Sequence, residues 1–171
     1  WSDYAGYYAT RVPVASPLYP SGSTIPAGSG IYRATNPIVV QSSTLSTDQK
    51  VIIYAPTTKV TLQGPITYTG GNYASFSRAP SLIIIADTID VAGSVQRLDG
   101  LYVAKTRFQT CSDTGFPVTP TVANTASCKN NLTVNGAVIT GNGVMTRTSG
   151  GDSPASMPSE IFRFRPDVFL T

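Results

Sequence analysis

The side chains that could perform chemistry in this chain are few. Its 171 residues include no histidine and two cysteines. Without histidine, Ser-His-Asp and Cys-His nucleophilic mechanisms are excluded. No glycine-rich phosphate loop or dinucleotide fingerprint is present, because Gly93 and Gly136 follow strand-like segments and do not open helices. We therefore expect no catalytic residues, no cofactor and no enzymatic activity.

Carboxylates are the remaining candidates for catalysis. Asp87, Asp90 and Asp99 lie close together in the sequence. Glycoside hydrolysis requires paired carboxylates. A polysaccharide lyase could use aspartates for calcium, Lys105 or an arginine as base, and Arg97 for the sugar acid. An aspartate before Thr or Gly is also ordinary turn chemistry. A polysaccharide-degrading enzyme is therefore the least favoured of three functions.

The two cysteines, Cys111 and Cys128, enclose a segment rich in Thr, Pro, Ser and Ala. We expect a disulfide that closes the loop 111–128, with two unpaired buried thiols as the alternative. Closing a loop of this size contributes about 3 kcal/mol in the chain-entropy model. Zinc would need further Cys or His ligands, so we expect no metal site. A disulfide indicates an oxidising compartment outside the cytoplasm.

Two short sequence phrases recur. The pattern apolar-polar-apolar-x-Gly-x-apolar occurs three times and places a glycine at the same position in each copy: Gly64, Gly93 and Gly136. An aliphatic run ending in alanine occurs at 51–55 and 82–86, with a variant at 100–104.

These repeats predict an all-β fold, a short parallel β-solenoid (right-handed β-helix) whose coils bend at the three glycines. An antiparallel β-sandwich or jelly roll is the alternative, since short strands with Gly and Asn-Gly turns fit it too.

The chain divides into residues 1–30 and a solenoid domain at 31–171. Residues 1–30 contain four prolines and show no helical period, which favours an extended arm or linker. This arm either lies along the body or reaches to a neighbouring molecule. Its aromatic side chains are expected to seek an apolar groove: Trp1, Tyr4, Tyr7 and Tyr8.

Composition narrows the range of partners. Only 12% of the residues are charged, the net charge is +3, and the basic residues are scattered. Nucleic-acid binding would show a basic stripe, and a membrane span would need about 18 consecutive apolar residues, so we expect neither. Because the chain starts with Trp1, we expect a processed product or a fragment. So few charges protect weakly against self-association.

Three segments together carry a resemblance to a known group of proteins. They are the IIADTI phrase at 84–89 and the LYVA phrase at 101–104 followed by Cys111. The third is the CKNNLTVNGAVI phrase at 128–139, which is followed by Arg147-Thr148 and by the closing PSEIFRFRPDVFL phrase at 158–170. From about residue 50 onward the chain resembles the C-terminal β-helix region of large predicted surface proteins of Saccharibacteria and related candidate-phylum bacteria. The resemblance implies an exported bacterial envelope protein. It brings no known activity.

The favoured function is an extracellular structural protein, a self-assembling subunit of a bacterial surface filament or layer. A solenoid has unpaired strand edges at both ends, which must be covered or paired with another copy. Its partners would be other copies in a homopolymer, or neighbouring domains of a larger envelope protein. The alternative is a cell-surface adhesin or carbohydrate-binding module, in which Tyr68, Tyr73 and Phe76 of a surface loop at 68–80 stack on a glycan.

Overall fold

The computed structural model describes residues 10–70, 75–113, 116–117, 128–147 and 158–165. Within these ranges the protein is all-β, with one short 3-10 helix at Phe76–Arg78 and no α-helix. The strands are β1 (Gly30–Arg33), β2 (Ile38–Val40), β3 (Ser43–Leu45), β4 (Lys50–Leu62), β5 (Ile66–Tyr68), β6 (Ser81–Ala92), β7 (Arg97–Asp113), β8 (Phe116–Pro117), β9 (Leu132–Thr140), β10 (Gly143–Val144) and β11 (Glu160–Phe164).

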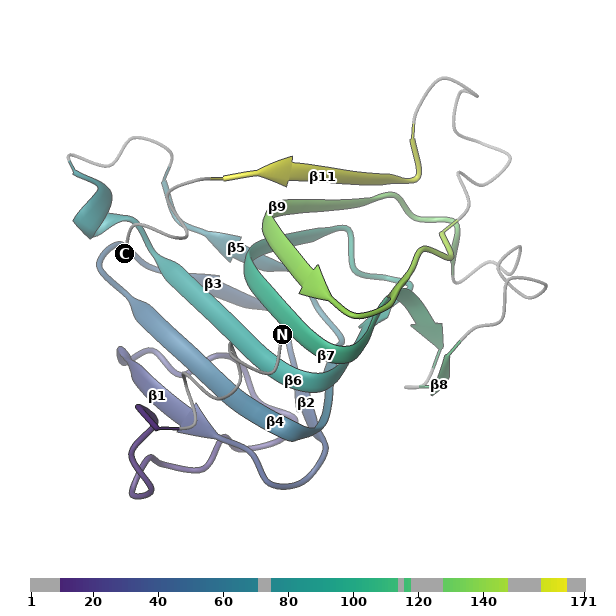
Figure 1. Ribbon diagram of the computed structural model, residues 1–171. Coiled ribbons are helices and arrows are strands. Elements are labelled where there is room, and N and C mark those ends of the chain that lie inside the picture. The colour runs from purple at the N-terminus through teal and green to yellow at the C-terminus, as the bar shows by residue number, and fades with distance from the viewer. Residues whose placement is uncertain (1–9, 71–74, 114–115, 118–127, 148–157, 166–171) are drawn as a thin grey trace.

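All eleven strands belong to one strongly curled sheet (Figure 1). The strand pairs are parallel except for the short β7–β8 pair, which is antiparallel. The prediction of an all-β, parallel fold is therefore confirmed. The alternative of an antiparallel sandwich does not fit these pairings.

The pairings form three parallel ladders that the chain visits in a constant order. The first ladder contains β1, the first halves of β4 and β6, the middle of β7 and the end of β9. The second contains β2, the second halves of β4 and β6, the end of β7, and β10. The third contains β3, β5, the start of β7, the start of β9, and β11. One passage through the three ladders is called a rung below.

Stacked apolar side chains fill the interior of the curl. The register aligns Ile53, Ile84 and Tyr102 on consecutive strands of the first ladder. These side chains belong to one large buried cluster that also takes residues from the other two ladders. Because like side chains stack on like, each rung buries apolar surface only when the next rung is present.

Residues 10–29 lie along the body and form the first rung. Leu18 pairs with Arg33 and Ser23 with Val40, both in parallel orientation. Tyr19 and Ile25 enter the main core with 4% and 6% of their surfaces exposed. Residues 10–29 therefore pack against the rest of the stack. The aromatic residues of the expected arm, Trp1, Tyr4, Tyr7 and Tyr8, lie outside the described residues.

The three glycines of the repeat lie where the chain passes between ladders, but not at the same corner. Gly64 and Gly93 separate the second ladder from the third, whereas Gly136 lies between the third and the first. The third copy of the repeat is therefore out of phase with the other two. Gly136 is in register with Gly100, which the repeat did not include.

Two of these positions require glycine because the backbone of a neighbouring rung lies very close to them. At Gly64 an added Cβ would overlap the backbone of Ser42, and at Gly136 it would overlap the carbonyl of Gly100. Gly136 and Gly100 also have φ values of 150° and 139°, a region that favours glycine. Gly93 is a turn residue whose carbonyl oxygen accepts hydrogen bonds from Arg147 and Asn130.

Replacing Gly136 by alanine is expected to lower the free energy of unfolding by at least about 2 kcal/mol, because steric overlap adds to an unfavourable φ. Denaturant titration followed by circular dichroism measures the change. Gly28→Ala is the matched control, since a Cβ there meets only Tyr32 Oη at an ordinary 3.7 Å. Equal effects of the two substitutions would contradict this account of the corner.

Candidate functional site

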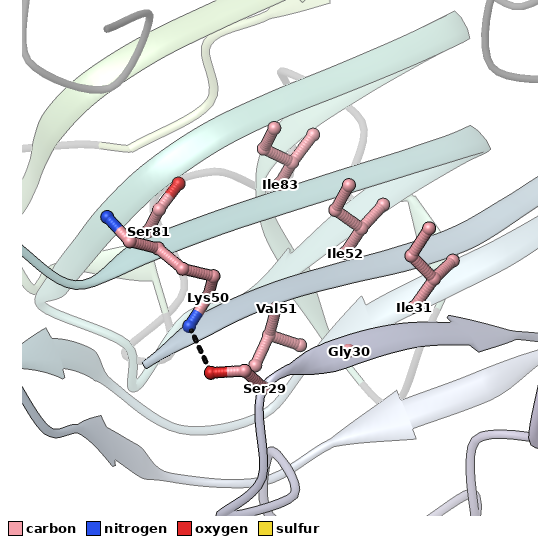
Figure 2. A pocket seen from close by; sticks show the side chains of 8 residues that line it. All are labelled: Ser29, Gly30, Ile31, Lys50, Val51, Ile52, Ser81 and Ile83. Atoms are coloured by element: carbon pink, nitrogen blue, oxygen red, sulfur yellow. Dashed lines mark hydrogen bonds between the residues drawn. The ribbon is translucent and has the colours of Figure 1, made fainter. Parts of the chain in front are cut away.

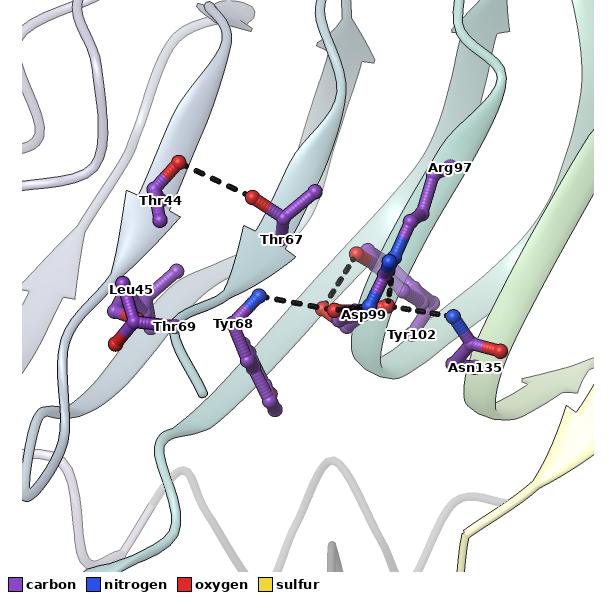
Figure 3. Close-up of polar contacts among 9 residues, drawn as sticks. All are labelled: Thr44, Leu45, Thr67, Tyr68, Thr69, Arg97, Asp99, Tyr102 and Asn135. Carbon is purple, nitrogen blue, oxygen red and sulfur yellow. Dashed lines mark hydrogen bonds and ion pairs between the residues drawn. The ribbon is translucent and has the colours of Figure 1, made fainter. Parts of the chain in front are cut away.

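A buried carboxylate, Asp99, organises the corner between the third and first ladders (Figure 3). It accepts hydrogen bonds from the Tyr68 backbone N–H at 2.9 Å and from Asn135 Nδ2 at 2.8 Å. The Arg97 guanidinium binds both of its oxygens, at 3.0 and 2.8 Å. The carboxylate therefore joins β5, β7 and β9 and has its charge balanced by a half-exposed arginine.

Tyr102 completes this corner from the interior side. Its hydroxyl donates to the Asp99 backbone carbonyl at 3.0 Å, and the side chain is fully buried. Burial raises the pKa of Tyr102 well above its ordinary value, with smaller contributions from Tyr68 and Asp99. The phenol therefore acts as a neutral donor that holds the corner.

Asp90 is the second buried carboxylate and lies on the second ladder. Arg107 donates to Asp90 Oδ1 at 3.1 Å, and Lys59 Nζ lies 3.9 Å from Oδ2. Asp87, the third of the predicted aspartates, accepts from Thr106 Oγ1 at 2.7 Å. Each aspartate thus has its own partners, and the structure assigns Arg97 to Asp99 as a structural ion pair.

Arg147 belongs to the phrases that carry the resemblance, but its structural role was not predicted from the sequence. Its guanidinium is buried and donates to four backbone carbonyls, at distances of 2.6 to 3.0 Å: those of Ala92, Gly93, Thr110 and Asn130. Burial lowers the pKa of Arg147 to about 10, so the side chain remains protonated at neutral pH. A single arginine in a polar stretch gave no signal of this role.

The disulfide lies next to this arginine clamp. Cys111 and Cys128 are bonded with an S–S distance of 2.04 Å, as expected, and both are fully buried. Thr146, beside Arg147, donates to the Cys111 carbonyl at 3.4 Å. Thr110 Oγ1 and the Arg147 backbone N–H both donate to Glu160 of β11. The last rung is thus attached to β7 through polar contacts as well as through strand pairing.

The prediction that Tyr68 lies on an exposed, glycan-binding loop is wrong. Tyr68 belongs to β5, is 6% exposed, and its hydroxyl accepts a hydrogen bond from the Leu82 backbone N–H at 2.7 Å. Tyr73 and the side chain of Phe76 lie outside the described residues. Tyr68 therefore cannot stack on a sugar in this conformation.

Most of the exposed large apolar side chains of the described residues belong to the first and the last rung. Those of the described residues are Val14, Leu18, Met145, Phe162 and Phe164. Leu18 belongs to the first rung, whereas Val14 lies on the flank of the stack, in a hollow with Tyr54, Pro56 and Thr57. At the other end, Met145, Phe162 and Phe164 line an apolar hollow together with β9 residues. Exposed apolar patches of this kind mark contact surfaces.

Comparison of the chain with protein-family models, with curated proteins and with solved structures finds no match. In the described ranges, no three His, Cys, Asp or Glu side chains group as metal ligands would. Within the same ranges, no helix has the length and hydrophobicity that a membrane-spanning helix requires.

Replacing Asp99 by asparagine is expected to lower the free energy of unfolding by about 1–3 kcal/mol, because the amide places an N–H₂ against the donors of Arg97 or Asn135. Thermal and denaturant unfolding measure the change. Asp48→Asn is the matched control, since Asp48 forms an ion pair with Arg78 in which both side chains are 55% exposed. A loss no larger than that of the control would show that the Asp99 network is not a structural determinant.

Alkaline pH is expected to destabilise the first rung through Tyr19. Burial raises the pKa of Tyr19 from 10.0 to about 12, so the unfolded chain ionises this phenol before the folded chain does. The stabilising contribution is complete below pH 10 and is lost as the pH rises through about 12. Unfolding titrations across this range, compared with Tyr19→Phe, measure it. An unchanged pH profile in the variant would contradict the assignment.

Proposed function

We propose that this protein is an extracellular structural subunit whose rungs form a right-handed parallel β-solenoid and whose ends bind other copies of the chain. The observation that carries the proposal is the apolar hollow that Met145, Phe162 and Phe164 line at the last rung, together with the exposed Leu18 of the first rung. The constant order of the three ladders supports the solenoid interpretation.

The strand edges at the two ends support the same proposal. Among the described strands, β11 of the last rung pairs with β9. At the opposite end, Leu18 and Ser23 of the first rung pair with Arg33 and Val40 of the second. The outermost strands of a stack of rungs are the places where a strand of another copy can add.

The two ends differ in sequence and structure, and this determines the kind of assembly. A contact between the last rung of one copy and the first rung of the next is heterologous. Such contacts continue into a filament unless the rotation between copies closes a ring. A surface filament or layer of a bacterial envelope is the assembly that this geometry supports best.

Low charge and the disulfide agree with this role. With 12% charged residues, like copies repel each other weakly. A buried disulfide suits a protein outside the reducing cytoplasm.

Placing a charge on the last rung is expected to abolish end-to-end association. Phe162→Asp puts a carboxylate into the apolar hollow beside Met145, where burial in a contact would cost several kcal/mol. Light scattering after size exclusion and negative-stain electron microscopy measure particle length. The wild-type protein is expected to form filaments or oligomers, and the variant is expected to be monomeric.

The matched control is Thr57→Asp, which adds the same charge to an exposed strand position in the middle of the stack. This variant is expected to assemble like the wild-type protein. A wild-type protein that remains monomeric at all concentrations would overturn the proposed function.

A further inference from the structure

A small hollow lies on the flank of the stack, at the outer side of the first ladder. Side chains alternate between the two sides of a strand. Figure 2 shows Ile31 and Ile52 on neighbouring strands, directed to the same side, and both belong to an apolar cluster separate from the main core. Arg33 and Tyr54 follow them by two residues and pair in the same register, so they lie on this outer side as well.

The hollow draws its walls from three separate stretches of the chain. These are residues 12–14, the end of β1 with the residues that follow it, and β4. Its volume is about 230 Å³. Pockets that hold drug-sized ligands begin at about 300 Å³, so this one suits a ligand of the size of a single sugar residue. The side chains that line it include Val12, Val14, Arg33, Thr35, Tyr54 and Pro56.

Arg33 brings a positive charge into this hollow without a matching carboxylate. In the described ranges its guanidinium donates one long hydrogen bond, to the Val14 carbonyl at 3.4 Å, and forms no ion pair. Arg97 and Arg107, by contrast, each pair with a buried carboxylate. A guanidinium has five N–H donors, so most of those of Arg33 remain available for an anion.

Tyr54 lies close to this charge. The side chain is 6% exposed, and burial raises the pKa of Tyr54, whereas the charge of Arg33 opposes the rise. The phenol therefore stays neutral at pH 7 and adds no negative charge that could satisfy the arginine.

We propose that this hollow binds the carboxylate of a sugar acid, with Arg33 as its ion-pair partner. A guanidinium holds a carboxylate through two parallel hydrogen bonds. The hydroxyl of Thr35 can donate to and accept from sugar hydroxyls. Val14, which is 90% exposed, and Pro56 offer apolar surface to the C–H face of a sugar ring.

The backbone around the hollow favours a sugar over a peptide. A peptide strand binds by pairing with an open strand edge. Here the Arg33 N–H already donates to the Pro17 carbonyl at 2.8 Å, and the Ala34 N–H donates to the Tyr54 carbonyl at 3.0 Å. Recognition is therefore left to side chains. The hollow lies on the flank and includes no residue of the last rung, so the inference does not rest on the proposed end-to-end assembly.

D-Galacturonate is the probe, titrated into the ¹⁵N-labelled protein and followed by NMR spectroscopy. Binding is expected to shift the amide signals of Ala34 and Thr35, which line the hollow. D-Galactose, which lacks the carboxylate, is expected to bind at least about tenfold more weakly, because the charge-assisted hydrogen bonds are lost.

Variants of Arg33 test the ion pair directly. Arg33→Gln is expected to weaken galacturonate binding by about tenfold or more. Arg33→Lys keeps the charge but loses the two-pronged geometry, so intermediate affinity is expected. Arg78→Gln is the matched control, because it removes the same charge from an exposed ion pair outside the hollow, and it is expected to bind like the wild-type protein. The amide spectrum of each free variant shows whether the fold is retained.

Three results would overturn the proposal. Galacturonate could shift no amide signals around the hollow, or Arg33→Gln could bind it as tightly as the wild-type protein does. The third is binding of N-acetyl-aspartate as tightly as galacturonate, which would assign the hollow to an acidic peptide.

Discussion

Contact between the backbones of successive rungs at the ladder corners is the constraint on which the rest of the structure depends. Gly136 pairs with Gly100, and the two backbones lie so close together that a Cβ on residue 136 would overlap the carbonyl oxygen of Gly100. This contact fixes the relative position of β7 and β9. The register in turn aligns Tyr102 with Val138 inside the curl and Leu101 with Ala137 outside it. A shift by one residue would exchange the inner and outer side chains of the whole strand.

Two networks of buried polar groups lie at these corners, whereas a third buried charge, Asp90, lies on the second ladder itself. Asp99 is bonded by Arg97, Asn135 and the backbone of β5. Arg147 binds four carbonyls where the chain turns between ladders. A turning backbone leaves carbonyl and N–H groups that the ladder does not pair, and a buried group of this kind must find a partner. The charged side chains satisfy groups that the parallel pairing leaves open.

The strands and their parallel pairing could be predicted from the sequence, because alternation and repetition of apolar residues are local signals. The disulfide could be predicted because the chain contains two cysteines that enclose a loop. The run Leu82–Ile85 showed a strand, and its lack of alternation corresponds to burial on both faces. The phase of the third repeat was not predictable, since Gly136 fits the same local pattern as Gly64 while it occupies another corner. Tyr68 was assigned to a loop because its burial depends on contacts with Leu82 and Asp99, which lie far along the chain. The role of Arg147 was not predicted for the same reason, because its four partners are brought together only by the fold.

The clamp of Arg147 has a consequence for the order in which the chain folds. Its guanidinium binds carbonyls 54 and 55 positions earlier in the sequence, those of Gly93 and Ala92. Such distant contacts form late, because a long stretch of chain must be ordered before they become favourable. Arg147 therefore contributes its four hydrogen bonds only in a chain whose rungs around Ala92, Thr110 and Asn130 are already stacked. Its stabilising effect depends on the whole of this region being folded, so the clamp couples the rungs that it joins.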